Sequence, residues 1–371
     1  MGREGIPGGG ERDIRAPAYF VEQLVALQRK LFDAVAGGRG QFQADQDAES
    51  AVVREGATGT DYSGDTIYRI DQRSEDALLE FCERWSRQLK EPFVLVAEGL
   101  PGDGRMPFPR GADPADASFE CIVDPIDGTR GIMYDKRSAW ALAAIAQGAG
   151  ELGRAPRLGD IVVAVQTELP TSRARLADTL WAIKGEGAHR VTRDIQIGEE
   201  WPARLVPSRA TSLAHGFATV TKFFPGTKER AAWLEERLFE RLVGNHAGGA
   251  PLVFDDEYIS SGGQLYELMV GHDRFVADLR PALMDARGLP GERHAGQAGA
   301  RRLCARPYDL CTALIAQEAG VAITDGWGKP LDVPLDTASD VAWIGYANST
   351  LRAQIEPVLQ ELLRELGVPE P

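Results

Sequence analysis

Phe119-Glu-Cys-Ile-Val-Asp-Pro-Ile-Asp-Gly-Thr129 is a short apolar run that ends in two carboxylates, Asp124 and Asp127. The apolar part is typical of a buried strand, and the proline between the carboxylates restricts the backbone. Carboxylate and carbonyl oxygens are the ligands that Mg²⁺ prefers, so both side chains and the Ile126 carbonyl are expected to converge on ions. Backbone N–H groups around Gly128 are suited to hold phosphate oxygens. The stretch therefore predicts a metal site at the end of a strand.

Two other interpretations of this stretch lead elsewhere. Aspartates in a turn often accept hydrogen bonds from nearby backbone N–H groups, and this purely structural role stays open at this point. Phosphatases of the haloacid dehalogenase type carry Asp-x-Asp-Gly-Thr, in which the first Asp is a covalent nucleophile. Here two residues separate Asp124 from Asp127 rather than one. Because side chains alternate along a strand, the additional residue would misplace the pair, and we exclude that type.

The rest of the chain alternates between strand-like and helical patterns. Apolar runs predict strands at 93–97, 139–146, 160–167, 179–183, 274–277, 321–324 and 341–345. Helical spacing predicts helices beginning near residues 20, 71, 227, 262, 308 and 349, the first ending at Gly37-Gly38 and the last containing Pro357. This order indicates layered α+β or α/β structure in two subdomains. We expect a disordered tail at 1–14, an N-terminal subdomain at 15–205 and a C-terminal subdomain at 206–371.

Composition limits the classes of partner. The chain has 371 residues and a formal charge of −14, so its surface should repel nucleic acid and anionic membranes. An anionic substrate therefore needs a local site that overrides this field, and bound metal ions are the obvious means. The four cysteines form no CxxC pair or zinc pattern, which favours a reduced, cytoplasmic protein. The start lacks the apolar segment of a signal peptide, and no run is long enough to span a bilayer.

Three further segments place an acidic residue next to a predicted strand or helix. Glu98 follows the strand at 93–97, Asp309 begins the helix near 308, and Asp71 precedes a helix. Taken singly, each has an ordinary role, because a Glu at a strand end is usually solvated and an Asp before a helix usually caps it. Their combination is what points to a function.

Together these segments resemble the inositol monophosphatase family, the lithium-sensitive Mg²⁺-dependent phosphatase superfamily with fructose-1,6-bisphosphatase and 3′-phosphoadenosine-5′-phosphate phosphatase relatives. Residues 124–129 match its Asp-Pro-[Ile/Leu]-Asp-Gly-Thr signature, and 308–320 are similar to its Trp-Asp…Glu-Ala-Gly signature, with Tyr in place of Trp. Gly185-Glu-Gly-Ala188 looks like its Gly-x-Gly-Ala loop, and Asp71 with Glu75 matches its Thr-x-x-Asp-x-x-x-Glu pattern, except that Tyr68 replaces the Thr. The resemblance implies a sugar-phosphatase-like fold of alternating αβαβα layers in two subdomains.

The resemblance also implies roles for individual residues. The ligands of two Mg²⁺ ions would be Glu98, Asp124, the Ile126 carbonyl, Asp127 and Asp309, with Asp71 helping to hold a third, weaker ion. Thr129 and Glu98 would position the attacking water, and the backbone N–H groups of Gly128 and Thr129 would hold the phosphate. Glu98, Asp127 and Thr129 would thus be the catalytic residues. The implied mechanism is direct in-line attack by a water that the metal ions activate, and the implied assembly is a homodimer.

The sequence departs from the family at three places that touch the choice of substrate. The family's Glu-Glu is Glu98-Gly99 here, its Asn-Phe after Asp-Gly-Thr is replaced by 130–133, and a long Gly/Arg-rich stretch occupies 286–306. That stretch contains Arg301 and Arg302, and Arg is the natural partner for a second phosphate. We hypothesise that it forms part of the substrate pocket or a lid, and a solvated surface loop is the alternative.

These observations predict Mg²⁺-dependent hydrolysis of a small phosphomonoester, an inositol or sugar phosphate. The same-class alternative is a fructose-1,6-bisphosphatase or a 3′-phosphonucleotide phosphatase, to which the basic stretch gives weight. An alternative of another class is a catalytically inactive protein that binds a phosphorylated metabolite. The joint presence of Glu98, Asp127 and Thr129 argues against such a binder, which would not need all of these groups.

Overall fold

The computed structural model describes residues 16–42, 52–54, 67–244, 252–286, 289 and 303–369. The tail expected at 1–14 and the two arginines Arg301 and Arg302 lie outside the described residues. Within the described part the chain forms two large β-sheets, one from each half of the sequence, and a two-stranded pair, β1 (Val52–Arg54) and β2 (Ile67–Tyr68).

The first sheet has eight strands in the order β10-β9-β8-β7-β6-β5-β3-β4. Their bounds are β3 (Phe93–Ala97), β4 (Arg105–Phe108), β5 (Phe119–Asp127), β6 (Ala139–Gln147), β7 (Ile161–Leu169), β8 (Leu176–Ile183), β9 (Ala188–Asp194) and β10 (Glu200–Ala203). β3 runs parallel to β5, and every other neighbouring pair is antiparallel. β5, which ends in Asp124 and Asp127, therefore lies inside the sheet, between β3 and β6.

The second sheet has five strands in the order β12-β11-β13-β15-β14. Their bounds are β11 (Gly216–Val220), β12 (Val253–Phe254), β13 (Asp273–Asp278), β14 (Ala322–Asp325) and β15 (Trp343–Tyr346). β11 runs parallel to both β12 and β13, while β15 is antiparallel to its neighbours. The loops after β11 and β13 consequently leave the sheet at the same edge, where ligands commonly bind in sheets with parallel strands.

Helices fill the spaces outside and between the two sheets. The longer ones are α1 (Pro17–Phe42), α3 (Arg69–Gln88), α6 (Lys228–Val243), α7 (Ser261–Val270) and α10 (Ser349–Glu365). The shorter ones are η1 (Pro114–Asp116), α4 (Thr129–Met133), α5 (Ala149–Leu152), η2 (Leu158–Asp160), α8 (Arg280–Asp285), η3 (Pro307–Leu310) and α9 (Ala313–Glu318). Among these helices, none combines the length and apolar character needed to cross a bilayer.

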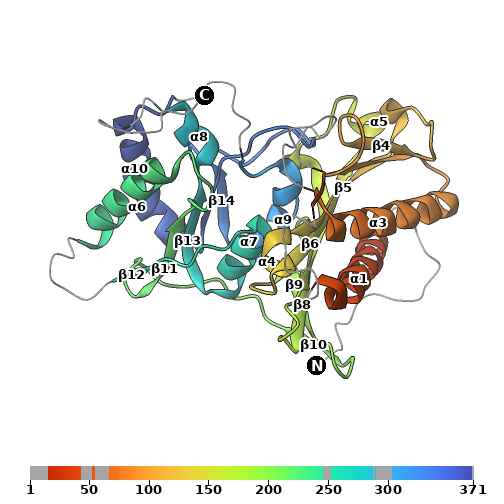
Figure 1. Cartoon of the computed structure of the whole chain (residues 1–371). Coiled ribbons are helices and arrows are strands. Elements are labelled where there is room, and N and C mark those ends of the chain that lie inside the picture. The colour runs from red at the N-terminus through yellow and green to blue at the C-terminus, as the bar shows by residue number, and fades with distance from the viewer. Residues whose placement is uncertain are drawn as a thin grey trace.

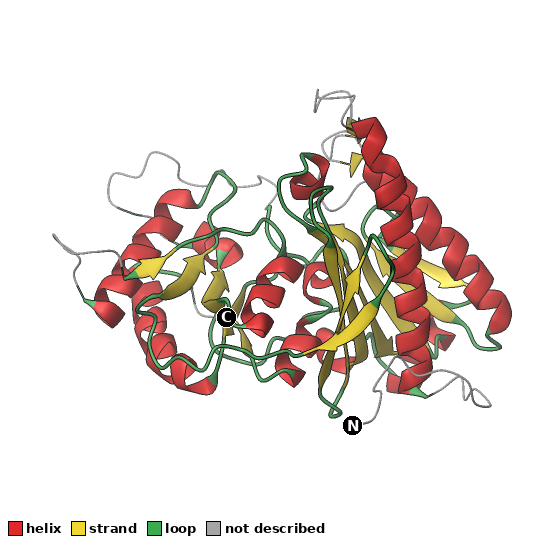
Figure 2. Ribbon diagram, turned by 90° about the horizontal axis from the view of Figure 1, so that it is seen from below, coloured by secondary structure: helices red, strands yellow, loops and turns green. Residues whose placement is uncertain are grey.

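The elements stack as five alternating layers (Figures 1 and 2). α1 and α3 cover the outer face of the first sheet, α7 and α9 lie between the sheets, and α6 and α10 cover the far face of the second sheet. This arrangement confirms the predicted layered α and β fold. It also explains why β5 is apolar on both faces: Cys121 and Val123 pack toward α1 and α3, whereas Ile122 packs into the core that joins the two sheets.

Several local expectations differ from the structure. The helix expected at 308–319 is divided into η3 and α9, because Pro307 and Asp309 close a separate short turn. The first helix continues past Gly37-Gly38 to Phe42, since a glycine lowers helix propensity by only about 1 kcal/mol and does not by itself end a helix. Strands β4, β9, β10, β11 and β12 and the pair β1 and β2 were not expected; β4 lies in a stretch whose Gly and Pro content favours a loop.

Candidate active site

A bulge in β5 sets the direction of the two carboxylates in the signature stretch. Asp124 pairs with Leu142 of β6 and Asp127 pairs with Trp140, so three steps along β5 match two steps along β6. In a regular strand, residues three apart point to opposite faces. The additional residue of the bulge changes this alternation, so that Asp124 and Asp127 can point to the same face. Carboxylate oxygens of Asp124 and Asp127 and of Asp309, which comes from η3, lie within 4.8 Å of one another.

The three carboxylates are held in an electrostatically unfavourable arrangement. Asp124 is 2% exposed and Asp127 is 6% exposed. Burial, followed by the charges of Asp127, Asp309 and Glu98, raises the pKa of Asp124 well above its ordinary value. Burial raises the pKa of Asp127 to about 6, and burial together with the charge of Asp127 raises the pKa of Asp309 to about 8. Such a cluster is stabilised by protons or by a cation.

The N-terminus of α7 holds one oxygen of Asp127. The Gly262 N–H donates to its Oδ2 at 2.6 Å, and the Ser260 hydroxyl is 2.9 Å from the same oxygen. Ser260 is also the N-cap residue of α7, with its Oγ accepting from the Gly263 N–H. A Cβ atom at position 262 would lie 3.1 Å from Asp127 Oδ2 and 2.6 Å from Leu142 Cδ2, so the approach of the helix requires a glycine there. The second subdomain thus fixes a side chain of the first.

Replacing Ser260 with Ala is expected to lower the free energy of unfolding by about 1–2 kcal/mol, because the substitution removes the cap of α7 and a hydrogen bond to a buried carboxylate. Urea unfolding of the purified variant measures the loss. Ser212→Ala, at an exposed position in a loop, is the matched control and should change little. An unfolding free energy for Ser260→Ala equal to that of the control would contradict this view of the cap.

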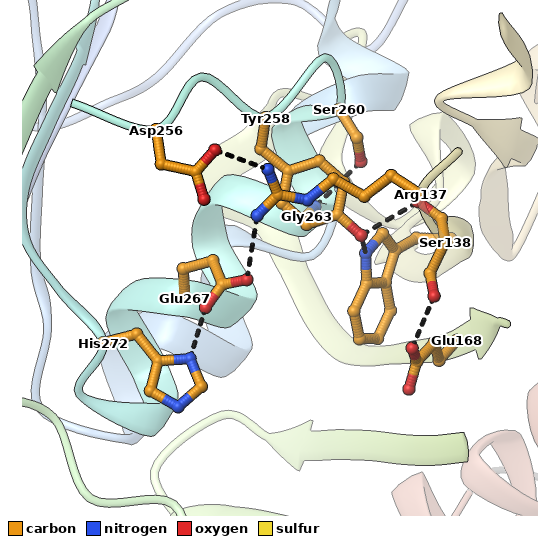
Figure 3. Close-up of polar contacts among 10 residues, drawn as sticks. Arg137, Ser138, Glu168, Asp256, Tyr258, Ser260, Gly263, Glu267 and His272 are labelled. Carbon is orange, nitrogen blue, oxygen red and sulfur yellow. Dashed lines mark hydrogen bonds and ion pairs between the residues drawn. The ribbon is translucent and has the colours of Figure 1, made fainter. Parts of the chain in front are cut away.

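A polar network around Tyr258 and Arg137 supports the segment that leads into Ser260 and α7 (Figure 3). The Tyr258 hydroxyl accepts from the indole Nε1 of Trp140 at 3.0 Å and donates to the Ser138 carbonyl at 2.9 Å. The guanidinium of Arg137 lies 3.9 Å from the centre of the Tyr258 ring, and it forms ion pairs with Asp256 and Glu267. Residues of β6 and the loop before it therefore tie down the segment that leads into α7.

Besides forming the cluster, two of the aspartates accept hydrogen bonds from nearby backbone N–H groups, which is the structural role that the sequence left open. Asp124 Oδ1 accepts from the Ile126 N–H at 2.9 Å, and Asp309 Oδ2 accepts from the Arg306 N–H at 2.6 Å. Asp309 therefore closes the turn of η3 instead of capping the following helix. Each carboxylate has a second oxygen, and these are the atoms that a cation would use.

The remaining expected site residues surround the same place. Asp71, in the first turn of α3, accepts a hydrogen bond from the Thr129 hydroxyl at 3.0 Å, and the same hydroxyl lies 2.9 Å from the Ile126 carbonyl. Glu98 follows β3 and faces the cavity, as does Gly128 at the start of α4. Asp71, Glu98 and Asp124 also line a smaller, adjoining cavity. Four separate stretches of chain thus supply the acidic groups.

The glycine at position 99 stands where the family has a second Glu. Its φ is +79°, and a Cβ atom there would overlap the carboxylate of Glu75. The space beside Glu98 is therefore already occupied by an acidic group from α3. This packing accounts for the absence of a side chain at 99.

Gly99→Ala is expected to be more destabilising than Gly102→Ala, although both glycines have positive φ values, +79° and +77°. The φ strain costs about 1–3 kcal/mol in either variant. Only at 99 must the Glu75 carboxylate also be displaced, since nothing lies within 4 Å of a Cβ at 102. Thermal unfolding of the two variants side by side measures the difference, and equal losses would contradict the role of Glu75.

The cluster forms one wall of a cavity of about 110 Å³. The lining also contains residues that the sequence did not single out, and these include Phe223, Phe224, Ile259, Arg280 and Leu303. Their only sequence signals were an aromatic pair and isolated apolar or basic residues, which are common everywhere. Ser260 and Gly262 carried a helix-start signal, but nothing in the pattern connected them with Asp127.

The second signature also makes a long-range contact. The carboxylate of Glu318, at the end of α9, accepts from the backbone N–H groups of Gly185 and Gly187 at 2.8 and 2.9 Å. These glycines form the turn between β8 and β9, the stretch that looks like the family's Gly-x-Gly-Ala loop. The contact anchors α9, and with it the chain that follows Asp309, to the first sheet.

Comparison with known proteins gives matches only at the level of structure. No family model and no curated protein matches the sequence. The IMPase of Thermotoga maritima matches with a TM-score of 0.56 and 17% identity, over 94% of this chain and 100% of its own. The extragenic suppressor protein SuhB of Bartonella henselae gives 0.57 and 16%, over 92% and 99%. The fructose-1,6-bisphosphatase of Leishmania major gives 0.56 and 13%, over 94% and 98%.

These neighbours establish the fold of the chain. It has the fold shared by the inositol monophosphatases and the fructose-1,6-bisphosphatases, as the signature stretches predicted. The likeness extends over almost the whole chain, including both sheets.

Proposed function

We propose that this chain is a Mg²⁺-dependent phosphatase that hydrolyses a small phosphomonoester. The observation that carries the proposal is the meeting of Asp124, Asp127 and Asp309 within 4.8 Å at a cavity. Burying like charges together is costly unless a cation offsets them. The fold neighbours, which include an IMPase and a fructose-1,6-bisphosphatase, support the same class of reaction.

The groups around the cavity fit Mg²⁺. The donor set consists of carboxylate and carbonyl oxygens, which suits a hard cation, and burial with mutual repulsion raises the pKa of Asp124, a strain that a cation relieves. We infer that two ions are held by Glu98, Asp124, the Ile126 carbonyl, Asp127 and Asp309, and that Asp71 contributes to a third. Bound Mg²⁺ would neutralise charge on the phosphoryl oxygens and make water a better nucleophile.

The chain's own groups would orient the reactants. The Thr129 hydroxyl has a single hydrogen, directed to Asp71 or to the Ile126 carbonyl, so its lone pairs can accept from a water. Glu98 would accept the proton that this water loses. The N–H groups of Gly128 and Thr129, in the first turn of α4, would donate to the phosphate. Attack is direct, and no covalent phosphoenzyme forms.

Phosphate release from a panel of phosphomonoesters and bisphosphates, with Mg²⁺ and with EDTA, tests this function. We expect release only with Mg²⁺, and a fall in kcat on the order of 10²–10³-fold or more in Asp309→Asn, because a buried charge at the metal site is lost. Asp116→Asn, at an exposed position before β5, is the matched control and should keep wild-type activity. Release from no ester would favour the non-catalytic binder.

Light scattering in the same buffer tests the homodimer expected from the resemblance.

A further inference from the structure

Part of the cavity lining, here called the apolar wall, consists of large apolar side chains. Phe223, Phe224, Ile259 and Leu303 line it, and the last two are 39% and 37% exposed. Large apolar side chains that remain exposed around a polar site commonly mark the place where an apolar part of a ligand lies. The cavity lining therefore combines the carboxylates with large apolar side chains and with the basic groups of Arg130, Arg280 and Arg306.

Contacts of the neighbouring Lys222 hold the segment that carries Phe223 and Phe224 in place. Lys222, the residue before it, forms ion pairs with Asp255 at 2.5 Å and with Glu235 at 3.0 Å. The Lys222 N–H donates to the carboxylate of Glu257 at 2.5 Å. The rings of Phe223 and Phe224 meet edge to face, with centres 4.9 Å apart and an angle of 82° between their planes. A ligand would therefore meet a surface that is already ordered, which lowers the entropic cost of binding.

A buried guanidinium, that of Arg280, packs against the two aromatic rings. Arg280 is only 4% exposed, and it lies 4.5 Å from the centre of the Phe223 ring and 5.3 Å from that of Phe224. It donates to both oxygens of Asp278, at 2.8 and 2.5 Å. Because Asp278 neutralises it, Arg280 is better suited to stiffen the aromatic pair than to bind a second phosphate. β11 and β13 run parallel, so both loops reach the cavity from the same edge.

We propose that the alcohol part of the substrate carries a planar aromatic group, which packs on Phe223 and Phe224 while the phosphate lies at the carboxylate cluster. The inference rests on the proposed phosphatase function. A bare polyol would lose water from its hydroxyl groups against this wall without gaining hydrogen bonds. An aromatic group loses little and gains stacking contacts, which correspond to about tenfold or more in binding. Phe223 and Phe224 are then the residues that determine specificity.

Adenosine 5′-monophosphate and ribose 5-phosphate form a matched pair of probes, because they present the same primary ester and differ by the aromatic base. With Mg²⁺, the wild-type protein is expected to have a kcat/KM about tenfold or more higher for the nucleotide. In Phe223→Leu and Phe224→Leu, which keep apolar volume but remove the ring, this ratio should fall toward one. Phe254→Leu is the control, since it removes an exposed aromatic ring that is not part of the cavity lining and lies on β12, beside the start of β11; its ratio should match wild type.

Inhibition by the free nucleosides gives a second measurement that needs no variant. Adenosine should inhibit phosphate release competitively, whereas ribose at the same concentration should not. A wild-type protein that is active on the panel but shows a ratio near one, or no inhibition by adenosine, overturns this inference and leaves the phosphatase function standing. A ratio of kcat/KM values that stays unchanged in both Phe223→Leu and Phe224→Leu overturns the inference as well. Absence of release from every ester would overturn the function and the inference together.

Discussion

Asp127→Asn is expected to lower kcat on the order of 10²–10³-fold or more while the protein stays folded. Asp127 is one of the three clustered carboxylates, so the substitution removes a negative charge where cations are expected to bind. Asn keeps the shape of the side chain and one acceptor oxygen for the Gly262 N–H. Without Mg²⁺, the variant should unfold at a temperature equal to or above that of wild type, because repulsion within the cluster falls.

Two measurements on the same preparations check this expectation. Phosphate release gives kcat, and thermal unfolding with and without Mg²⁺ gives the change in stability. Asp116→Asn again serves as the control for a lost acidic side chain, since Asp116 is exposed in η1, before the end of β5 that lies away from the cluster. Full activity in Asp127→Asn would show that the carboxylate has no part in the reaction. A large loss of stability in the metal-free variant would show instead that its negative charge stabilises the fold.

Stability of the metal-free protein is expected to fall as pH rises from about 4 to 8, and Mg²⁺ should restore most of it at pH 8. The pKa of Asp127 is raised to about 6 and that of Asp309 to about 8, against an ordinary value near 3.8. A carboxyl group with a raised pKa in the folded state contributes no penalty while both states are protonated. The penalty grows as pH rises above the unfolded-state pKa, near 3.8, and levels off once the pH passes the folded-state pKa. Each unit corresponds to about 1.4 kcal/mol, so the total is on the order of a few kcal/mol.

The test is thermal unfolding at pH 5, 6.5 and 8, with EDTA and with Mg²⁺. Other groups also titrate in this range, so the informative quantity is the difference between wild type and Asp124→Asn/Asp309→Asn. That difference should favour the double variant increasingly as pH rises in EDTA. The gain from Mg²⁺ should be largest at pH 8 for wild type and small for the variant, because cation binding requires ionised ligands. A pH-independent difference in EDTA would contradict the electrostatic cost assigned to the cluster.

The layered fold could be predicted largely because its signals are local. β5 sits inside a sheet with a layer of helices on each face, and a strand in that position reads as a continuous apolar run. The strands at 139–147 and 161–169 share this environment and were found within two residues of their ends. β9 and β10 lie toward the exposed end of the sheet and carry many polar residues, so their pattern is weak. Local periodicity therefore found the long apolar strands and missed polar or short ones, including the largely buried β11.

The site was predictable in its ligand types but not in its geometry. Strict alternation would send Asp124 and Asp127 to opposite faces of the sheet, and only the bulge opposite Leu142 and Trp140 corrects this. Whether a bulge forms depends on the partner strand, which the stretch 119–129 does not contain. The place of Asp309 depends likewise on how η3 packs across the first sheet, 182 residues after Asp127 in the chain.

The order of acidic and glycine residues along the chain was sufficient to indicate a class of fold and a set of candidate metal ligands. The folded molecule alone decided that Ser260 and Gly262 hold Asp127, that Glu75 occupies the space beside Gly99, and that an aromatic pair lines the same cavity as the carboxylates. The reason is physical. Secondary structure follows from spacing along a few neighbouring residues, whereas contacts between distant side chains follow from register, packing and burial, which involve the whole chain at once.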